Sequence, residues 1–231
     1  IVFHCIVFPS MLKAHGEYAL PVNVPANQFL NLEGRKFSKS KGWVIEQHQY
    51  LVNFADFPNK EDALRYALIR TMPENKDGDF KWDEFVALHD NELADNLGNF
   101  FNRVLSFIHK YCDGKAPNFD KNITIKGVSE DEETSFSNFS SQKLMPLLLQ
   151  IEKDILSFEF KNAVNNVLEI SRIGNAMFQS NAPWKLAKEQ PDAPEIKSVL
   201  ALGLQIAAVS TIIIEPFLPF IAKKMRRLLG M

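Results

Sequence analysis

The sequence predicts a mainly α-helical protein, in which a short mixed α/β segment precedes a helical bundle. Residues 1–72 are punctuated by turn-forming residues such as Gly34, which separate short strand-like and helix-like segments. In residues 73–231, by contrast, apolar residues recur at spacings of three and four, the period of an α-helix. The segment 71–78 has the composition of a linker, so we place a domain boundary after residue 72.

Overall composition and charge exclude several classes of protein. The chain has 231 residues, of which 46% are apolar, so it can bury a sizeable core and is not a disordered polyelectrolyte. A formal net charge of −2 excludes a globally basic nucleic-acid-binding protein, although it permits a local basic site. Two cysteines are too few for a disulfide framework or a four-cysteine zinc site, and the five histidines are scattered, so we expect no metal site.

The two most apolar stretches lie near the ends of the chain. Residues 199–214 are shorter than the about 20 residues that span a bilayer, and Glu215 and Pro216 end them. We therefore expect a core helix there and no membrane-spanning segment. The chain opens within a second apolar run, residues 1–8, which we expect to be a buried strand or helix in a piece of a longer protein.

A β-hairpin is predicted within residues 28–37. Its first half alternates apolar and polar side chains, and Gly34 suits the positive φ of a tight turn. The next segment, 38–43, is too polar for a core strand, so we expect an exposed loop. Residues 61–72 then carry apolar residues at helical spacing, with two acidic residues near the positive N-terminal end of the predicted helix.

Helical patterns fill the rest of the chain. Residues 82–111 form the longest pattern, with apolar residues three and four apart along one face. Residues 118–134 are polar and acidic, so we expect a solvated surface excursion there. Pro216 and Pro219 must kink or end the last helix. The further helices are predicted at 144–156, at 163–178, from 183, and from 194 onward.

The most informative string is KFSKS, residues 36–40. Its two lysines, Lys36 and Lys39, are three residues apart and are separated by one phenylalanine and one serine, on a loop just after the predicted hairpin. Lysine offers three donors on a long flexible stem, so the string suits a polyphosphate. A reaction that releases pyrophosphate needs cations that stabilise the charge of the transition state more than that of the ground state. A solvated lysine-rich turn is the structural alternative.

The string resembles the KMSKS signature of class I aminoacyl-tRNA synthetases, with Phe37 where methionine is commonest. Residues 3–12, FHCIVFPSML, resemble the segment that lines the methionine pocket of methionyl-tRNA synthetases. Residues 99–103 and the Ala–Pro–Trp sequence at 182–184 resemble the anticodon-reading elements of that family. Because these segments come from both ends of the chain, the whole chain is similar to the methionyl-tRNA synthetases.

The resemblance implies one particular part of such an enzyme. The HIGH signature of class I synthetases and the family's zinc-binding knuckle have no counterpart here. Residues 1–72 are therefore expected to be the C-terminal end of a Rossmann-type α/β catalytic domain, and residues 73–231 an α-helical anticodon-binding domain. Arg65 and Tyr66, in a segment that resembles the family's D-x-L-R-Y sequence, are expected to link the two domains. Alone, this part should lack ligase activity.

For the whole enzyme, the resemblance implies ATP-dependent activation of methionine and its transfer to tRNA(Met) in the cytoplasm. ATP with Mg²⁺ would be the cofactor, and any zinc site would lie outside this chain. The partners would be tRNA(Met), ATP and methionine, without a membrane, and the oligomeric state stays open.

The resemblance also assigns roles within the KFSKS string. Lys36 and Lys39 would be catalytic, because they would hold the triphosphate of ATP and then the departing pyrophosphate. Lys39 is expected to be the stronger contact. Phe37, Ser38 and Ser40 complete the expected ATP-binding set.

Four further positions receive roles in the same way. His4, in the apolar N-terminal strand, would line the methionine pocket, where a neutral imidazole suits an uncharged thioether. Asn99 and Arg103 are four apart, so they share a helix face, and would read anticodon bases on their Watson–Crick edges. Trp184 would stack on a base, which contributes about 1–3 kcal/mol. Without the family, Asn99 and Arg103 would simply be a solvated helix face.

Two alternatives differ in class. Another class I synthetase of the same helical-bundle group, for cysteine, isoleucine, leucine or valine, would share the KFSKS string, but Trp184 and residues 3–9 argue against it. A helical interaction module with an accidental KFSKS string would have negligible RNA affinity, and the net charge of −2 keeps this alternative open.

Overall fold

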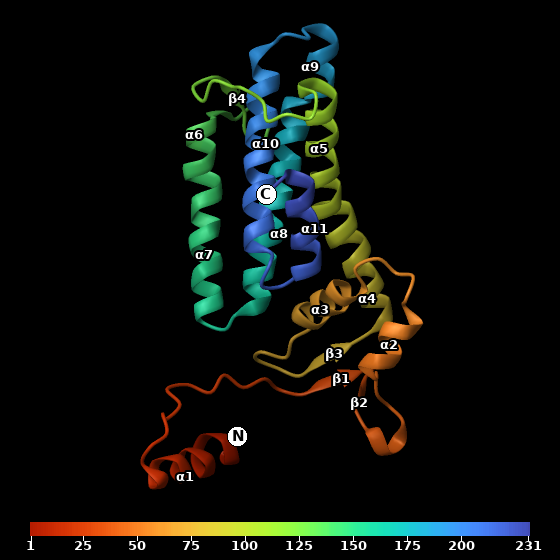
Figure 1. The fold of residues 1–231 in the computed structure, drawn as a ribbon, viewed down its shortest axis with the longest axis vertical. Coiled ribbons are helices and arrows are strands. Elements are labelled where there is room, and N and C mark those ends of the chain that lie inside the picture. The colour runs from red at the N-terminus through yellow and green to blue at the C-terminus, as the bar shows by residue number, and fades with distance from the viewer.

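The computed structural model describes residues 1–231 and shows an elongated helical body joined to a small α/β unit (Figure 1). A first helix, formed by the π-helical segment η1 (Phe3–Val7) and α1 (Phe8–His15), lies apart from both. An extended segment connects this helix to the α/β unit. The mainly α-helical fold class predicted from the sequence is confirmed.

The α/β unit is built around a three-stranded sheet in the order β2–β1–β3. The central strand β1 (Leu30–Leu32) pairs antiparallel with β2 (Arg35–Lys36), with Asn31 opposite Lys36. On its other side β1 pairs in parallel with β3 (Gly78–Phe80), with Asn31 opposite Asp79. The sheet therefore joins segments that are more than 40 residues apart in the sequence.

The predicted hairpin is confirmed in its turn as well as its strands. Glu33 and Gly34 have φ values of 50° and 74°, as a two-residue turn that matches the twist of its strands requires. The helix predicted at 61–72 is also confirmed. The helical elements of this unit are the 3₁₀ turn η2 (Lys39–Lys41), α2 (Gln47–Asn53) and α3 (Lys60–Arg70).

The body contains one long continuous helix that packs against two others, α8 and α10. This long helix consists of α4 (Trp82–Leu88), the π-helical segment η3 (His89–Gly98) and α5 (Asn99–Cys112), as the periodicity over 82–111 predicts. The other elements are β4 (Thr124–Lys126), β5 (Glu133–Ser135), α6 (Phe136–Phe139), η4 (Ser140–Leu144), α7 (Met145–Leu156), α8 (Phe160–Asn181), α9 (Pro183–Glu189), α10 (Pro194–Ile213) and α11 (Pro219–Leu229).

Helix α10 runs through the body and supplies much of its core. By length and composition it could cross a membrane, but 61% of its most apolar window is buried inside the protein. Leu200, Leu202 and Ile206 are fully buried against the neighbouring helices. The expected core helix is therefore confirmed, and it ends before Pro216, as the sequence predicts.

The small core of the α/β unit continues past residue 72. Leu32, Tyr50, Phe80 and Phe85 pack in one cluster, so residues on β3 and α4 belong to the same core as β1 and α2. The long helix from α4 to α5 then carries the chain into the body. The two units therefore share this helix, and the boundary placed after residue 72 stays a prediction.

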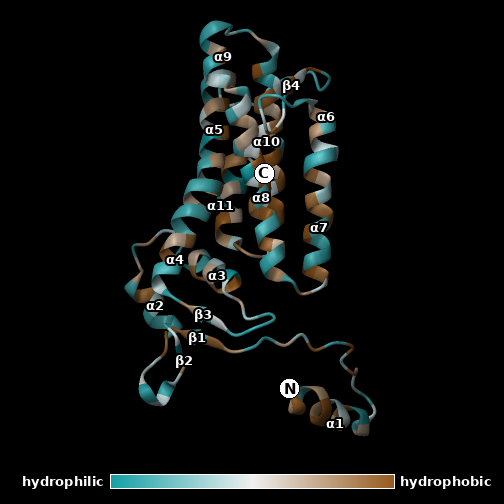
Figure 2. Cartoon of the chain, turned by 180° about the vertical axis from the view of Figure 1, so that it is seen from behind, coloured by the Kyte–Doolittle hydropathy of each residue, from teal (hydrophilic) through white to brown (hydrophobic).

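Two expectations are corrected by the structure. The apolar run at 1–8, expected to be buried, is exposed and helical, and His4 lies in this helix rather than in a strand. Without a neighbouring strand, a helix is the conformation that pairs the backbone groups of this segment locally. Figure 2 shows this helix, much of it in the brown of hydrophobic residues, lying apart from the body. The surface excursion at 118–134 also contains a hairpin of β4 and β5 that the sequence analysis did not predict, with Ile125 buried.

Replacing Gly174 by alanine is expected to destabilise the protein. A Cβ at Gly174 would lie 2.4 Å from Cε2 of Phe100, whose side chain is fully buried and cannot move aside. Overpacking of this kind costs about 1–3 kcal/mol, more than alanine gains over glycine in a helix, about 0.5–1 kcal/mol. Thermal unfolding should therefore show a lower midpoint. Arg172→Ala, an exposed change on the same helix, should leave the midpoint unchanged.

Alkaline pH is expected to weaken the α/β unit through Tyr50. This buried phenol donates to the carbonyl oxygen of Lys60, 2.8 Å away, and burial, aided by the charge of Glu61, raises its pKa from 10.0 to about 12. Between these pH values the unfolded chain releases the proton and the native protein keeps it. Stability is therefore lost as pH rises from 10 to 12, at about 1.4 kcal/mol per pH unit. Urea unfolding should show this loss, and Tyr50→Phe should show a smaller one, because burial also raises the pKa of Tyr66, which contributes over the same pH range.

Candidate functional site

The KFSKS string connects the end of the hairpin to a short 3₁₀ turn. Lys36 ends β2, and Lys39 begins η2. Two backbone hydrogen bonds close this loop: Ser38 N–H donates to the Trp43 carbonyl oxygen at 3.0 Å, and Trp43 N–H donates to the Ser38 carbonyl oxygen at 2.9 Å. Gly42 returns the chain with φ 66°, a value that a residue without a Cβ adopts without strain. The string is thus a defined, closed loop.

Both lysines of the loop are available to a ligand. Lys36 and Lys39 are exposed, and neither ammonium group forms an ion pair. The Lys36 Nζ lies 5.5 Å from the ring centroid of Phe29. The hydroxyl groups of Ser38 and Ser40 lie 3.3 Å apart at the head of the loop. Two free cations and two hydroxyl groups on one loop form a suitable surface for a polyphosphate.

The base of the loop is held by four residues of the α/β unit. Trp43 Nε1–H donates to the carbonyl oxygen of Leu32 at 2.8 Å, which ties the end of the loop to β1. Both carboxylate oxygens of Asp79 accept from Gly34 N–H, at 2.9 and 3.0 Å. Trp43 therefore ties the end of the loop to the sheet, and Asp79 holds the hairpin turn that precedes the loop.

A second group of candidate residues lies at the far end of the body. Arg103 projects from α5 and Trp184 from the start of α9, and the Arg103 Cζ atom lies 5.2 Å from the indole centroid. The guanidinium group also lies 3.5 Å from Asn175 Oδ1 and 3.3 Å from Gln179 Oε1, both on α8. The structure thus brings two residues together that are about 80 positions apart in the sequence.

Trp184 is half-exposed, and the buried part of its indole packs against other aromatic rings. Its indole stacks on Phe107, with centroids 5.7 Å apart and an interplanar angle of 28°, and Phe107 stacks in turn on Phe178 at 5.8 Å. Asn99 lies one turn before Arg103 on α5 and is exposed. An amide, a guanidinium group and a supported indole on one end of the body are groups that can read and stack unpaired bases.

The sequence analysis missed three residues of this group. Asn175 and Gln179 hold the Arg103 side chain, but they are more than 70 positions away and carried no signal in the sequence. Phe107 was not singled out, because its apolar character suits the core equally well. Its spacing of four from Arg103 was a usable signal, since residues four apart share a helix face.

The two groups of candidate residues are far apart. The KFSKS loop lies at one end of the molecule and α9 at the other, with the long helix between them (Figure 1). At 1.5 Å per residue, a helix from residue 82 to residue 112 is on the order of 45 Å long. A single small ligand cannot reach both groups, whereas a long nucleic acid can. His4, in the exposed first helix, lies near neither group.

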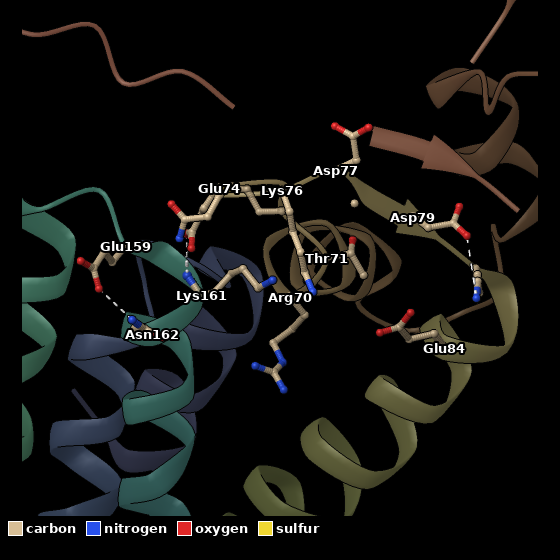
Figure 3. A pocket seen from close by; sticks show the side chains of 14 residues that line it. Arg70, Thr71, Glu74, Lys76, Asp77, Asp79, Glu84, Glu159, Lys161 and Asn162 are labelled. Atoms are coloured by element: carbon tan, nitrogen blue, oxygen red, sulfur yellow. Dashed lines mark hydrogen bonds and ion pairs between the residues drawn. The ribbon is translucent and has the colours of Figure 1, made fainter. Parts of the chain in front are cut away.

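A cavity of about 580 Å³ at the junction of the two units contains none of the candidate residues. Figure 3 shows its side chains coming from the end of α3, the segment before β3, and the start of α8. Two of its carboxylates already have structural partners: Asp77 accepts from Phe29 N–H, and Glu74 accepts from Lys161 N–H. No group of three or more His, Cys, Asp and Glu residues in the chain could hold a metal ion.

Comparisons with known proteins assign the chain to a family. Residues 1–105 match the family described as tRNA synthetases class I (M), and residues 128–231 match the anticodon binding domain of methionyl tRNA ligase. The chain belongs to the methionyl-tRNA synthetase family. It is 45% identical to a methionine–tRNA ligase from Phocaeicola vulgatus, over the whole chain, and 44% identical to one from Flavobacterium psychrophilum, over 99% of the chain.

The chain spans about one third of the length of these relatives, 32% and 31%. A solved structure, the methionyl-tRNA synthetase of Mycobacterium tuberculosis bound by methionyl-adenylate, matches with a TM-score of 0.81 at 24% identity. The match covers all of this chain and 42% of that one. This likeness shows the fold alone, a small α/β unit followed by a helical body.

Proposed function

We propose that this chain supplies two parts of a methionine–tRNA ligase, the loop that binds the phosphates of ATP and the domain that reads the anticodon of tRNA(Met). The observation that carries the proposal is the order of two matches to the same enzyme family, a catalytic-domain end and then an anticodon-binding domain, over most of the chain. Two features of the structure support the proposal. At one end of the molecule, backbone hydrogen bonds close the KFSKS loop, and its lysines form no ion pair. At the other end, Arg103 lies over the ring of Trp184.

The proposed first step is the activation of methionine. Its carboxylate oxygen attacks the α-phosphorus of ATP, the bond to the bridging oxygen breaks, and methionyl-adenylate and pyrophosphate result. Negative charge accumulates on the leaving pyrophosphate, and Lys36 and Lys39 stabilise it from the loop, with Ser38 and Ser40 as further donors. Mg²⁺ would enter with ATP, because this ion is usually held by the phosphates of the substrate. His4 would line the methionine pocket.

In the proposed second step, a ribose hydroxyl group of the terminal adenosine of tRNA(Met) attacks the carbonyl carbon of methionyl-adenylate. The bond to the phosphate oxygen breaks, AMP leaves, and the methionyl ester of the tRNA results. The bundle selects that tRNA. The Arg103 guanidinium group would donate to the exposed edges of anticodon bases, and the Asn99 amide would both donate to them and accept from them. Trp184, supported by Phe107, would offer its free surface for stacking. The whole enzyme would act in the cytoplasm. Residues 1–72 would form the C-terminal end of its catalytic domain, and residues 73–231 would form its anticodon-binding domain.

A pyrophosphate-exchange assay on the full-length protein tests this function. Methionine should drive the exchange of label between pyrophosphate and ATP, while cysteine, isoleucine, leucine and valine should not. Exchange driven by one of those four amino acids would assign the chain to a sister synthetase. Exchange with none of the five would contradict the ligase function and favour a helical interaction module.

A further inference from the structure

Helix α3 carries a buried carboxylate that reaches across to the last helix of the body. Asp62 is fully buried, and its Oδ2 accepts a hydrogen bond of 2.6 Å from Ile221 N–H, in the first turn of α11. The N-terminus of a helix offers such unpaired N–H groups, and its dipole favours a negative charge. Asp62 thus caps a helix that begins about 160 residues later in the sequence.

One turn further along α3, Arg65 holds the segment just before α11. Its Nε–H donates to the carbonyl oxygen of Phe217 at 2.9 Å, and its Nη2–H donates to that of Pro216 at 3.1 Å. Both carbonyl groups belong to the turn between α10 and α11. Asp62 and Arg65 therefore hold residues 216–221 from both ends, one as acceptor and one as donor. We refer to these two side chains and their three backbone hydrogen-bonding partners as the α3 clamp.

Burial of the charged groups of the α3 clamp costs free energy, whereas burial of apolar side chains is favourable. The second oxygen of Asp62, Oδ1, is buried without a hydrogen-bond partner. Burial raises the pKa of this carboxyl above its usual range, although the hydrogen bond from Ile221 opposes the effect. An apolar pair would avoid the desolvation penalty, but it would not fix one register, since apolar contacts are not directional. Each bond of the clamp, in contrast, needs one particular backbone group.

The same helix makes further polar contacts with the body. Tyr66 and Arg70 both bind the carboxylate of Glu92 on η3, with an Arg70–Glu92 distance of 3.0 Å, and Arg70 also binds Asn165 on α8. Asp62, Arg65, Tyr66 and Arg70 all lie on α3, which follows the KFSKS loop in the α/β unit. Together with the long helix that the two units share, α3 therefore sets the position of that loop relative to the anticodon-reading end.

We propose that Asp62 and Arg65 are positioning residues for the transfer of methionine to tRNA, because they fix the separation between the KFSKS unit and the anticodon-reading end. This inference rests on the proposed function. A tRNA bound by its anticodon reaches the catalytic site only if that separation is correct. Activation of methionine uses ATP and methionine alone, so it does not depend on the clamp.

Arg65→Met in the full-length protein tests the proposal. It keeps an unbranched, flexible stem but removes both hydrogen bonds to residues 216 and 217. We expect kcat/KM for the charging of tRNA(Met) to fall at least about tenfold, while methionine-dependent pyrophosphate exchange stays within about twofold of wild type. Arg65→Lys, which keeps one donor, should give an intermediate loss. Arg227→Met, an exposed arginine on α11, is the matched control and should change neither activity.

A second readout separates positioning from mere stability. Binding of Arg65→Met to tRNA(Met) should still discriminate against a changed anticodon as wild type does, because Trp184 and Arg103 are untouched. Equal losses of charging and exchange, or unchanged charging in Arg65→Met, would overturn the proposal. Asp62→Asn keeps an oxygen that accepts from Ile221 N–H, so it should retain charging, whereas Asp62→Leu should lose it. Failure of the proposed function itself would appear differently, as wild-type protein without methionine-dependent exchange.

Discussion

Replacing Lys39 by alanine in the full-length protein is expected to lower kcat for methionine-dependent pyrophosphate exchange by about 10²- to 10³-fold. This is the usual effect of removing one preorganised group that stabilises charge in the transition state. The loop itself should not change, because the two backbone hydrogen bonds between Ser38 and Trp43 close it without the lysine side chain. Single-turnover measurement of adenylate formation would separate this effect on the chemical step from an effect on ATP binding.

Lys41 provides a matched control for Lys39. It lies in the same 3₁₀ turn, is exposed, and stands outside the KFSKS string. The effect of Lys39 on kcat depends either on the position of its ammonium group or on the total positive charge of the loop. If the position decides, Lys41→Ala should leave kcat within about threefold of wild type. Equal losses in Lys39→Ala and Lys41→Ala would show that only the general charge matters, and no loss in Lys39→Ala would remove the loop from the mechanism.

Replacing Trp184 or Arg103 by alanine is expected to remove most of the discrimination between anticodons. Loss of one base-stacking contact costs about 1–3 kcal/mol, so the Kd for tRNA(Met) should rise about 5- to 150-fold. The Kd for a tRNA with another anticodon should hardly change, since a wrong base is not held at its edge by Asn99 and Arg103 and is therefore not placed on the indole. Filter binding or fluorescence anisotropy at one fixed salt concentration would give both constants.

The outcome for Arg103 needs its own control, because a lost arginine also weakens contact with any phosphate backbone. Arg227→Ala removes an exposed arginine from α11, away from the Trp184 group. Its effect, if any, should be equal for all tRNAs. If Arg103→Ala behaves in the same way, with equal losses for both anticodons, then Arg103 binds the backbone and does not read bases.

The local features of the fold could be predicted from the sequence because their signals are local. Gly34 between two alternating segments predicted the hairpin, and the apolar spacing over residues 82–111 predicted the long helix. Pro216 predicted that the apolar helix ends before this residue. In each case the deciding interactions lie within a few residues of one another, so a short window of sequence contains them.

The features that the sequence did not reveal depend on distant partners. The pairing of β3 with β1 joins residues on both sides of the expected linker, and three-residue strands carry too short a pattern to recognise. The N-terminal helix was expected to be buried, because its apolar character alone does not say whether a partner surface is present. The bonds of Asp62 and Arg65 span about 150 positions, and only the family resemblance indicated that this segment links two domains.

The candidate sites also divide into those with a local sequence signal and those that depend on distant residues. The KFSKS string was found because its chemistry lies in five consecutive residues. Arg103 and Trp184 were found only through the family resemblance, and the structure adds that they lie 5.2 Å apart. Their supporting residues, Phe107 and Gln179, came from the structure alone.

The most direct test of this account is the binding of the chain to tRNA(Met) with its CAU anticodon, compared with the same tRNA in which one anticodon base is changed. At physiological salt, we expect the unchanged tRNA to bind more tightly by about 1–3 kcal/mol, the usual cost of one wrong base. Equal affinity for the two tRNAs, or no binding of either, would contradict the claim that this bundle reads the anticodon.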